Sequence, residues 1–386
     1  MNKQQEPRLR FKVFSGAWKE KKIGEILSEV RRSIYLEDSE KYQLVTVKRR
    51  NEGVVSRGYL FGKDILVKNY SQLKTNDYLI SKRQIIHGAN GIIPSELDNA
   101  IVSNEYLVVV SNNDVRTEFL TLVSRTPSMY RKFLLSSYGV DIEKMVFNVE
   151  DWKGREITLP SLPEQTHLGL FFRRLDSQIT ESRAVLEKSR QLKKAMLAKM
   201  FPANGEKIPK IRFKGFEGEW EWKKLGEIGE LYQPRTITGT DLTFTGYPVF
   251  GANGYIGFYG EANHFEDQVT ISARGEGTGT ANYVTAPVWI TGNSMVINVD
   301  CNNEIDKNFL FALLTAMSLK KYVTGGAQPQ LTREVLEKIS LKIPTLPEQT
   351  AIGNFFRQLD ETITLQSAEI EKLNQLKKGL LAAMLV

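Results

Sequence analysis

The sequence predicts an α+β protein built as an internal repeat, in which two mixed α/β domains are separated by two long helices that pair antiparallel as a coiled-coil spacer. Three observations predict this class. A segment of 42 residues returns 184 positions later, and a shorter segment returns 202 positions later. Both copies of the longer segment also have the apolar spacing of a long helix. The repeated frame therefore implies a pseudo-twofold arrangement.

The longer repeat matches Leu159–Met200 with Ile343–Met384, and 24 of the 42 positions are identical. Pro-Glu-Gln-Thr begins at the fifth position of each copy, at Pro163 and Pro347. Proline suits the first helical position, and glutamate suits the positive end of the helix dipole. Phe201-Pro202 marks the end of the first copy. We therefore expect helices over 163–200 and 347–384.

The first of these helices has a narrow apolar seam. Leu168, Phe172, Leu175 and Ile179 alternate in steps of four and three. A seam at this spacing favours a partner helix, which the second copy supplies. The alternative is two independent amphipathic helices, each packed on its own domain. Against it, a helix of about 57 Å is longer than one small domain can cover.

The shorter repeat is an aromatic and basic lead-in, Pro7–Ile26 against Pro209–Ile228. The middle segments that follow share only a faint echo, Asn104–Val110 against Asn293–Val299. The lead-ins and the long-helix segments, which we call the frame, are therefore duplicated, while the middle segments have diverged. The expected parts are a first domain with its lead-in at 1–158, the first helix and connector at 159–208, a second domain with its lead-in at 209–342, and the second helix at 343–386.

The middle segments have the pattern of short strands, short helices and glycine-rich loops. In the first we expect strands at 78–81 and 100–110, with helices at 117–124 and 127–137; in the second, strands at 269–272 and 288–299, with a helix at 307–323. The segment 274–280 resembles a nucleotide-binding loop but lacks its lysine. Its position between strands favours a hairpin turn with glycines at positive φ.

Composition excludes several classes of protein. The 386 residues are 41% hydrophobic and 25% charged, as in an ordinary soluble globular protein. No apolar stretch reaches 18 residues and the first ten residues are polar, so we expect no membrane helix and no signal peptide. Cys301 is the single cysteine and the three histidines are scattered. We therefore expect a cytoplasmic protein without disulfides or a structural metal.

The sequence lacks two motifs typical of methyl transfer and of nucleotide binding, while nothing favours a Ser-His-Asp, Cys-His or paired-carboxylate site, which stays open. No two prolines are adjacent, so the Asn-Pro-Pro-Tyr type of motif with which amino-methyltransferases hold an exocyclic amine is missing. Gly62-Lys63 is followed by Asp64, so a phosphate-binding loop is unsupported. The net charge of +7 permits nucleic-acid binding without requiring it. Residues 229–342 hold 8 basic and 11 acidic residues, a net charge of −3.

Together these motifs resemble one known family. The paired Leu-Pro-Glu-Gln segments, the two Phe-x-Gly-x-Trp lead-ins and the Thr-Gly-Gly-Ala-Gln-Pro-Gln-Leu segment at 324–331 are similar to those of the specificity subunit of type I restriction–modification systems. The resemblance covers nearly the whole chain. It implies that each middle segment is a target recognition domain for one half of a bipartite site in double-stranded DNA, with the two helices as the spacer. The acidic second segment departs from a simple phosphate-binding surface.

The resemblance also implies partners. It predicts a non-catalytic subunit that recruits two adenine methyltransferase subunits and further restriction and translocase subunits. Those partners use S-adenosylmethionine, ATP and Mg²⁺, whereas this chain is expected to bind no cofactor and no membrane. Contacts with the methyltransferase are expected on the long helices.

Candidate base-contacting residues follow from side-chain chemistry, because Arg and Lys pair with guanine while Asn and Gln pair with adenine. The candidates in the first domain are Lys48, Arg49, Arg50, Arg57, Lys82, Arg83, Gln84, His87 and Asn90, and those in the second are Arg235, Asn253, Tyr255, Arg274, Gln328, Gln330 and Arg333. The alternative for the basic clusters is a solvated surface. For Gln328 and Gln330 the alternative is capping of a helix that starts near Thr332.

Two other classes of function stay open. A free-standing sequence-specific or architectural DNA-binding protein would share the polar loops, but would not need a duplicated spacer. A coiled-coil scaffold would use the helices, but would leave the two divergent domains without a role.

Overall fold

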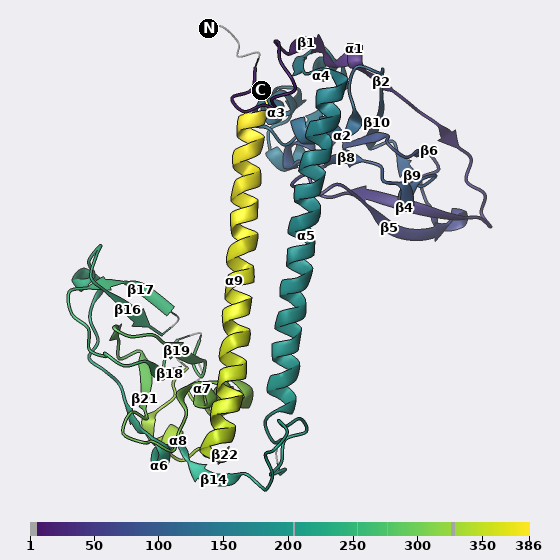
Figure 1. Cartoon of the computed structure of the whole chain (residues 1–386). Helices are drawn as coiled ribbons and strands as arrows, with labels where there is room; N and C mark the ends of the chain where they lie inside the picture. Colours follow the sequence, from purple (N-terminus) through teal and green to yellow (C-terminus); the bar gives the residue numbers. More distant parts are fainter. Residues whose placement is uncertain (1–5, 204, 253, 276, 326–328) are drawn as a thin grey trace. The chain divides into compact units, whose positions relative to one another are not determined.

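The computed structural model describes residues 6–203, 205–252, 254–275, 277–325 and 329–386. The chain forms two compact units. Unit 1 is Met1–Glu181 with Ile370–Val386, and unit 2 is Ser182–Glu369. Two long helices, α5 (Leu162–Lys199) and α9 (Leu346–Met384), each contribute one segment to each unit (Figure 1). Both predicted helices are therefore confirmed to within one residue at each end.

Unit 1 consists of a four-stranded sheet in the order β2-β10-β7-β8, a five-stranded sheet in the order β3-β6-β9-β4-β5, and two strand pairs, β1-β13 and β11-β12. Its strands are β1 (Lys19–Lys22), β2 (Leu27–Glu29), β3 (Ser33–Ile34), β4 (Lys41–Val47), β5 (Val54–Phe61), β6 (Tyr70–Gln72), β7 (Tyr78–Ser81), β8 (Asn90–Ile92), β9 (Ile101–Ser103), β10 (Tyr106–Ser111), β11 (Ser137–Tyr138), β12 (Val146–Phe147) and β13 (Glu156–Leu159). Its short helices are α1 (Ile23–Ile26), α2 (Thr117–Val123), α3 (Pro127–Leu135) and α4 (Val149–Lys153).

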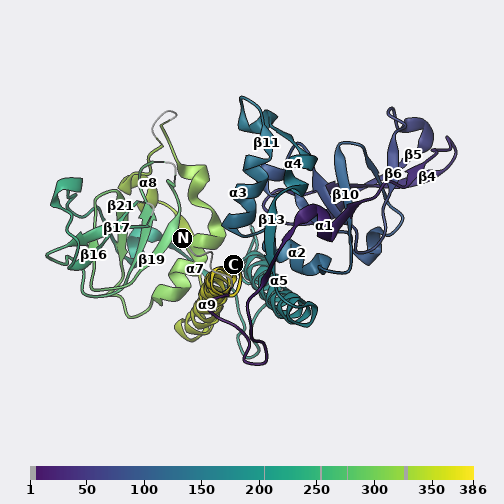
Figure 2. The same ribbon diagram turned by 90° about the horizontal axis from the view of Figure 1, so that it is seen from above.

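Unit 2 has a four-stranded sheet in the order β15-β21-β18-β19, a three-stranded sheet in the order β17-β16-β20, and the strand pair β14-β22. Its strands are β14 (Glu221–Lys224), β15 (Glu230–Tyr232), β16 (Tyr247–Gly251), β17 (Gly254–Tyr259), β18 (Gln268–Ser272), β19 (Ala281–Val284), β20 (Trp289–Ile290), β21 (Ser294–Asn298) and β22 (Ser340–Ile343). Its short helices are α6 (Leu225–Ile228), α7 (Lys307–Met317) and α8 (Arg333–Glu337), of which α7 covers the four-stranded sheet (Figure 2).

The two units share a topology that their sequences conceal. Each four-stranded sheet is antiparallel and begins at the strand after the lead-in. In each smaller sheet a hairpin, β4-β5 or β16-β17, is joined in parallel to one further strand, β9 or β20. The internal repeat therefore covers the domains as well as their frame, and the predicted fold class is confirmed.

Two predicted strands are divided by turns. The segment 100–110 forms β9 and β10, and the segment 288–299 forms β20 and β21. In both cases the first half belongs to the smaller sheet and the second half to the four-stranded sheet. The predicted helix at 307–323 also ends early, at Met317, because Ser318 takes a positive φ of 50°.

Each unit has one main core. In unit 1 it joins Trp18, Phe119 and Trp152 to Leu168 and Phe172 of α5. In unit 2 the main core joins Trp220 and Phe309 to Phe201 and to Ile352 and Phe356 of α9. The rings of Phe201 and Phe356 are stacked with their centroids 5.8 Å apart.

Within each unit the segments of α5 and α9 run antiparallel. In unit 1, Asp176 pairs with Lys377, while Leu168 shares the core with Met384. In unit 2, Lys193 pairs with Asp360, and Met200 shares the core with Ile352. The residue numbers of both ion pairs add to 553, so a single antiparallel register accounts for both.

The Pro-Glu-Gln motif fastens each domain to its helix. Gln165 Oε1 accepts a hydrogen bond of 2.7 Å from the Arg116 amide before α2, and its Nε2 donates to Pro160 O at 3.0 Å. Gln349 repeats both contacts, with the Asp306 amide and Pro344 O. In each unit the glutamine therefore bonds both the N-cap amide of a domain helix, α2 or α7, and a carbonyl just before the long helix.

Each lead-in lies beside a helix end. The Leu9 N–H donates to Ala383 O at 2.9 Å, and the Ile211 N–H donates to Lys199 O at 2.9 Å. Leu9 corresponds to Ile211 in the shorter repeat, and Ala383 corresponds to Lys199 in the longer one. The contact that the pseudo-twofold repeat requires at the end of α9 is therefore present.

Candidate nucleic-acid interface

In unit 1 the structure brings together two of the segments that hold predicted site residues. The β4-β5 turn carries Arg49 and Arg50, and the loop after β7 carries His87. The Arg50 N–H donates to His87 O at 2.7 Å, and the Asn51 N–H donates to Gly88 O at 2.9 Å. These two backbone hydrogen bonds hold the turn and the loop side by side.

The β4-β5 turn is conformationally unusual. Arg50 and Asn51 have φ values of +61° and +56°, the pattern of a type I′ turn. A side chain with a Cβ pays a conformational cost in this region. Gly88 faces the turn at φ +74°, and a Cβ there would come within 2.9 Å of Asn51 Nδ2. The close approach of the two segments therefore requires glycine at position 88.

A third segment, which sequence reasoning missed, completes this surface. The β11-β12 hairpin places Glu143 Oε2 2.8 Å from Arg49 Nη2 and Glu143 Oε1 3.2 Å from His87 Nε2. The signal that could have found it is the 184-residue offset, which aligns 138–146 with 322–330 and so with the glutamine-containing loop of the second copy. We refer to the three segments 48–53, 82–90 and 138–146 as the unit 1 face.

The other predicted residues of unit 1 have different surroundings. Lys82 Nζ donates to Asn104 O at 2.9 Å, and Arg83 pairs with Glu105 at 2.7 Å while remaining 62% exposed. Lys48 and Arg50 are exposed, and so is Arg57 on the edge strand β5. The side-chain oxygen of Gln84 is enclosed and has no hydrogen-bond partner in the part of unit 1 that the structure describes.

Asn90, which the sequence suggested as a base-contacting residue, is buried inside unit 1. It is 1% exposed. Its Oδ1 accepts from the Tyr78 hydroxyl at 2.6 Å, and its Nδ2 donates to Asn51 Oδ1 at 3.0 Å. Burial raises the pKa of Tyr78, so this hydroxyl stays protonated and remains a donor. Asn90 therefore supports the β4-β5 turn from below and is not presented to solvent as a base-contacting side chain.

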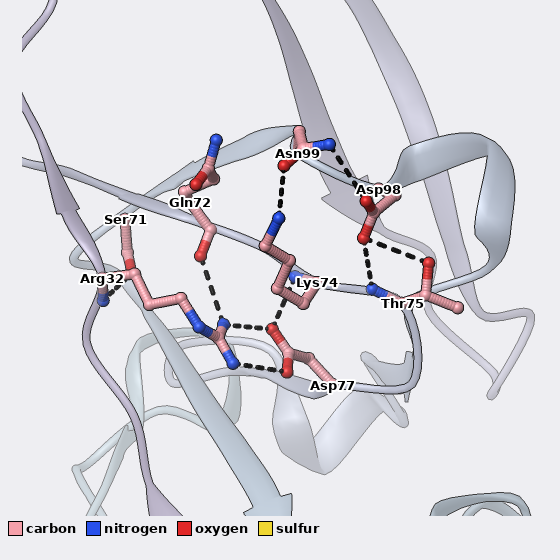
Figure 3. A network of polar contacts seen from close by, with 8 residues as sticks. All are labelled: Arg32, Ser71, Gln72, Lys74, Thr75, Asp77, Asp98 and Asn99. Carbon is pink, nitrogen blue, oxygen red and sulfur yellow. Dashed lines mark hydrogen bonds and ion pairs between the residues drawn. The ribbon is translucent and has the colours of Figure 1, made fainter.

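A polar network links the two sheets of unit 1 near the start of β7 (Figure 3). Arg32, between β2 and β3, donates to both carboxylate oxygens of Asp77, at 2.6 and 3.0 Å. The Asp77 side chain is 3% exposed and also accepts from the Lys74 amide at 2.8 Å. Lys74 continues to Asn99 at 2.6 Å. This network positions the five-stranded sheet, and with it the β4-β5 turn, on the four-stranded sheet.

In unit 2 the corresponding loops also converge. The Thr324 N–H donates to Gln330 O at 3.0 Å and the Gln330 N–H donates to Thr324 O at 2.8 Å, which closes the loop between them. Thr278, in the turn between β18 and β19, donates its hydroxyl to Pro329 O at 3.2 Å. Gly275 and Gly279 have φ values of +86°, which confirms the hairpin predicted for 274–280.

The predicted residues of unit 2 that the structure describes are exposed. Arg235, Arg274 and Gln330 are exposed. Tyr255, on β17, is 56% exposed and packs edge-on against Phe250. Two further predicted residues, Asn253 and Gln328, lie outside the described residues.

Two contacts in unit 2 concern Arg333 and the start of the helix near Thr332. Arg333 pairs with Glu337 one helical turn away at 2.7 Å, and this hydrogen bond raises the pKa of the guanidinium. The N-cap of α8 is Thr332, whose side chain makes no capping hydrogen bond. Gln330 contributes its backbone N–H and carbonyl to the closure of the loop.

One backbone contact aligns the two units residue by residue. The Phe147 N–H donates to Lys82 O at 3.1 Å in unit 1, and the Leu331 N–H donates to Ala273 O at 3.1 Å in unit 2. Arg83 and Arg274 each follow the accepting residue. The two arginines therefore occupy equivalent positions, although the surrounding sequences have diverged.

The described residues contain no group of three or more His, Cys, Asp or Glu side chains placed to hold a metal ion. Within the same residues, no helix combines the length and the apolar character needed to cross a bilayer. The unit 1 face and the loops of unit 2 that carry Arg274 and Gln330 present guanidinium, ammonium, carboxylate and amide groups. Such groups form directional hydrogen bonds with base edges and phosphates.

Comparison with known proteins identifies relatives of this chain. Residues 217–375 match the type I restriction modification DNA specificity domain. The chain is 28% identical over 168 residues to the EcoprrI specificity subunit of Escherichia coli, a match that covers 42% of this chain and 41% of that protein. It is 24% identical over 268 residues to the putative MjaX specificity subunit of Methanocaldococcus jannaschii, which covers 63% of this chain and 61% of that protein. The matched segments thus span less than two thirds of these relatives.

Solved structures show the same fold. The S subunit of a type I restriction–modification system from M. genitalium aligns with a TM-score of 0.69 at 17% identity, over 99% of both chains. A chain from a study of complex assembly and conformational transition of the type I R-M system aligns with a TM-score of 0.54 at 18% identity, over 94% of this chain and 96% of that one.

Proposed function

We propose that this chain, which belongs to the family of type I restriction–modification specificity subunits, recognises a bipartite sequence in double-stranded DNA, one half with each unit. The observation that carries the proposal is the pair of equivalent loop faces on a duplicated frame, with Arg83 and Arg274 at matching positions. Two similar domains with different loop residues suit two half-sites of different sequence.

The surface chemistry supports this assignment. In unit 1, Lys48 and Arg50 are exposed beside Arg49 in the β4-β5 turn, and Arg57 is exposed on β5. These positive charges suit phosphate contacts. In unit 2 the middle segment has a net charge of −3, so we assign it fewer phosphate contacts. Its exposed Arg274 and Gln330 suit direct contacts with guanine and adenine.

The chain is proposed to act without catalysis of its own. In this proposal α5 and α9 set the spacing between the half-sites and dock two methyltransferase subunits, and a restriction subunit joins the same assembly in the cytoplasm. S-adenosylmethionine, ATP and Mg²⁺ belong to those partners. The chain alone is then expected neither to methylate nor to cut DNA.

The decisive experiment is a domain exchange. Residues 229–342 would be replaced by the equivalent segment of a relative with a different target, the chain co-expressed with its methyltransferase, and the methylated sites sequenced. The proposal expects one half-site to change while the other half-site and the spacer stay as in the parent. A change in both halves would contradict independent recognition by the two units.

A free-standing DNA-binding protein is the alternative, which the relatives of this chain do not favour. It predicts tight, sequence-specific binding by the purified chain alone at physiological salt. If addition of the methyltransferase leaves both affinity and specificity unchanged, this second candidate is favoured over the complex.

A further inference from the structure

The β11-β12 hairpin of unit 1 occupies the place of the glutamine-containing loop in unit 2. Ser137 and Tyr138 pair with Phe147 and Val146, as Thr324 pairs with Gln330. Each loop is followed by a short helix, α4 or α8, and by a strand that pairs with the lead-in. The two loops therefore occupy the same place in the chain order of their units, and the pair that closes the unit 1 loop encloses two residues more than the pair that closes the unit 2 loop.

The chemistry of the unit 1 loop is distinctive. Gln330 in unit 2 corresponds to Val146, so the amide side chain of the second copy has no counterpart at that position. The polar group that reaches the centre of the unit 1 face is instead the carboxylate of Glu143, between Arg49 and His87. Val140, at the tip of the same loop, is fully exposed.

Stability does not explain the contact between Glu143 and Arg49. The two side chains are 50% and 52% exposed, and ion pairs of this exposure add little to folding stability. The pair does hold the guanidinium in one orientation next to a carboxylate at the surface, which lowers the cost of ordering both groups when a ligand arrives.

The two groups together match one base pair. In the major groove guanine presents two acceptors, O6 and N7, and cytosine presents the N4 amino donor beside them. A guanidinium pairs with the guanine acceptors, and a carboxylate accepts from cytosine N4. An A·T pair offers the carboxylate the adenine amino group but leaves the guanidinium only a single acceptor on the purine.

We infer that Glu143 is a specificity-determining residue of unit 1, and that Glu143 and Arg49 together recognise one G·C base pair in the half-site of that unit. This inference rests on the proposed function. Arg49 donates to guanine O6 and N7, and Glu143 accepts from cytosine N4. His87 Nε2 lies 3.2 Å from the other oxygen of this carboxylate.

The test uses Glu143→Gln, which preserves shape and removes the charge. The variant would be assembled with the methyltransferase, and its affinity measured for a set of duplexes that carry each base pair at each position of the wild-type target. We expect discrimination to fall about 5- to 150-fold at one position, which is a G·C pair in wild type, in the half-site of unit 1 only. Arg49→Gln should lose discrimination at the same position.

Glu37→Gln is the matched control, because it removes the same charge from an exposed glutamate outside the unit 1 face. It should leave every base preference as in wild type. The inference is overturned if Glu143→Gln keeps full discrimination at all positions, if it weakens all duplexes equally, or if the half-site of unit 1 contains no G·C pair. A wild-type complex without any sequence preference would instead overturn the proposed function.

Discussion

Arg10 donates two hydrogen bonds of 2.7 Å to the carboxylate of Glu164, whose side chain is 2% exposed. Arg212 makes the same two contacts, also at 2.7 Å, with Glu348. Each pair ties a lead-in to the first turn of a long helix. The glutamate of the Pro-Glu-Gln motif therefore has a more specific role than its effect on the helix dipole, because it fastens the repeated frame in both units.

Removal of one partner from this buried pair should destabilise unit 1. Glu164→Gln leaves the Arg10 guanidinium, 16% exposed, without its counter-charge, and breaking such a pair costs about 3–5 kcal/mol in the free energy of unfolding. Chemical denaturation of the whole chain measures the loss. Glu348→Gln should give a loss of similar size in unit 2.

Glu181→Gln is the control for both variants, since it neutralises an exposed glutamate on α5. It should change the free energy of unfolding by less than about 0.5 kcal/mol. If Glu164→Gln and Glu181→Gln behave alike, the pair with Arg10 does not fasten the frame.

Substitutions of Arg50 can distinguish the effect of its charge on DNA binding from the effect of its positive φ on stability. Its φ of +61° suits glycine, so Arg50→Gly should keep or raise the stability of unit 1 by up to about 1 kcal/mol. The same variant removes one exposed positive charge, and the slope of log affinity against log salt should flatten by about 1 if Arg50 contacts a phosphate. Binding at several salt concentrations measures the slope.

Two further variants of Arg50 make the comparison specific. Arg50→Asn also tolerates positive φ and should flatten the slope equally, whereas Arg50→Lys should retain the wild-type slope. A wild-type slope for Arg50→Gly would remove Arg50 from the DNA-contacting set.

His264 gives unit 2 a pH dependence. Its side chain is buried, Nε2 lies 2.8 Å from the Tyr232 hydroxyl and Nδ1 lies 2.6 Å from Asn263 Oδ1. Burial lowers the pKa of His264 below its usual value. The unfolded chain then binds a proton near pH 6.5 that the folded chain does not bind, so the free energy of unfolding should fall as pH drops below about 6.5.

His264→Gln removes this titration and keeps hydrogen-bonding groups. Denaturation at pH 7.5 and pH 5.5 should therefore show a smaller pH dependence in the variant than in wild type. An identical pH dependence in both would mean that His264 has the same pKa in the folded and the unfolded chain.

Much of the frame could be predicted from sequence because it repeats. The helices follow from the duplicated segments, and the exposed arginines Arg83 and Arg274 follow from residue type on glycine-rich loops. The Glu143 contact with Arg49 could not be predicted, because it joins loops 94 residues apart. The positive φ of Arg50 was equally hidden, since hydrogen bonds from the loop at 87–88 stabilise a turn that the local sequence disfavours.

The common topology of the two middle segments could not be predicted for a different reason. Sheets need alternation of apolar residues and not particular residues, so two sheets can match without sequence identity. In the structure Leu107 and Val109 correspond to Met295 and Ile297, because both pairs face the main core. That offset is 188, whereas the sequence echo suggested 189. An alignment of the two strands at 189 would place each side chain on the opposite face of the sheet from its structural counterpart.

Matched insertions at the boundary between the units should lengthen the DNA spacer, if α5 and α9 set it as proposed. Four residues added after Glu181 in α5 and four after Glu369 in α9 leave Asp176 paired with Lys377 and Lys193 paired with Asp360, because each ion pair lies within one unit. Four helical residues add about 6 Å, and DNA rises about 3.4 Å per base pair. The spacer should therefore grow by one or two base pairs, with the residual twist taken up by DNA deformation at a cost of a few kcal/mol.

Sequencing of the methylated sites measures the spacer and both half-sites. Insertion in α5 alone is the control, since it shifts the antiparallel register and should reduce stability. An unchanged spacer with the paired insertions would show that the helices do not set the distance.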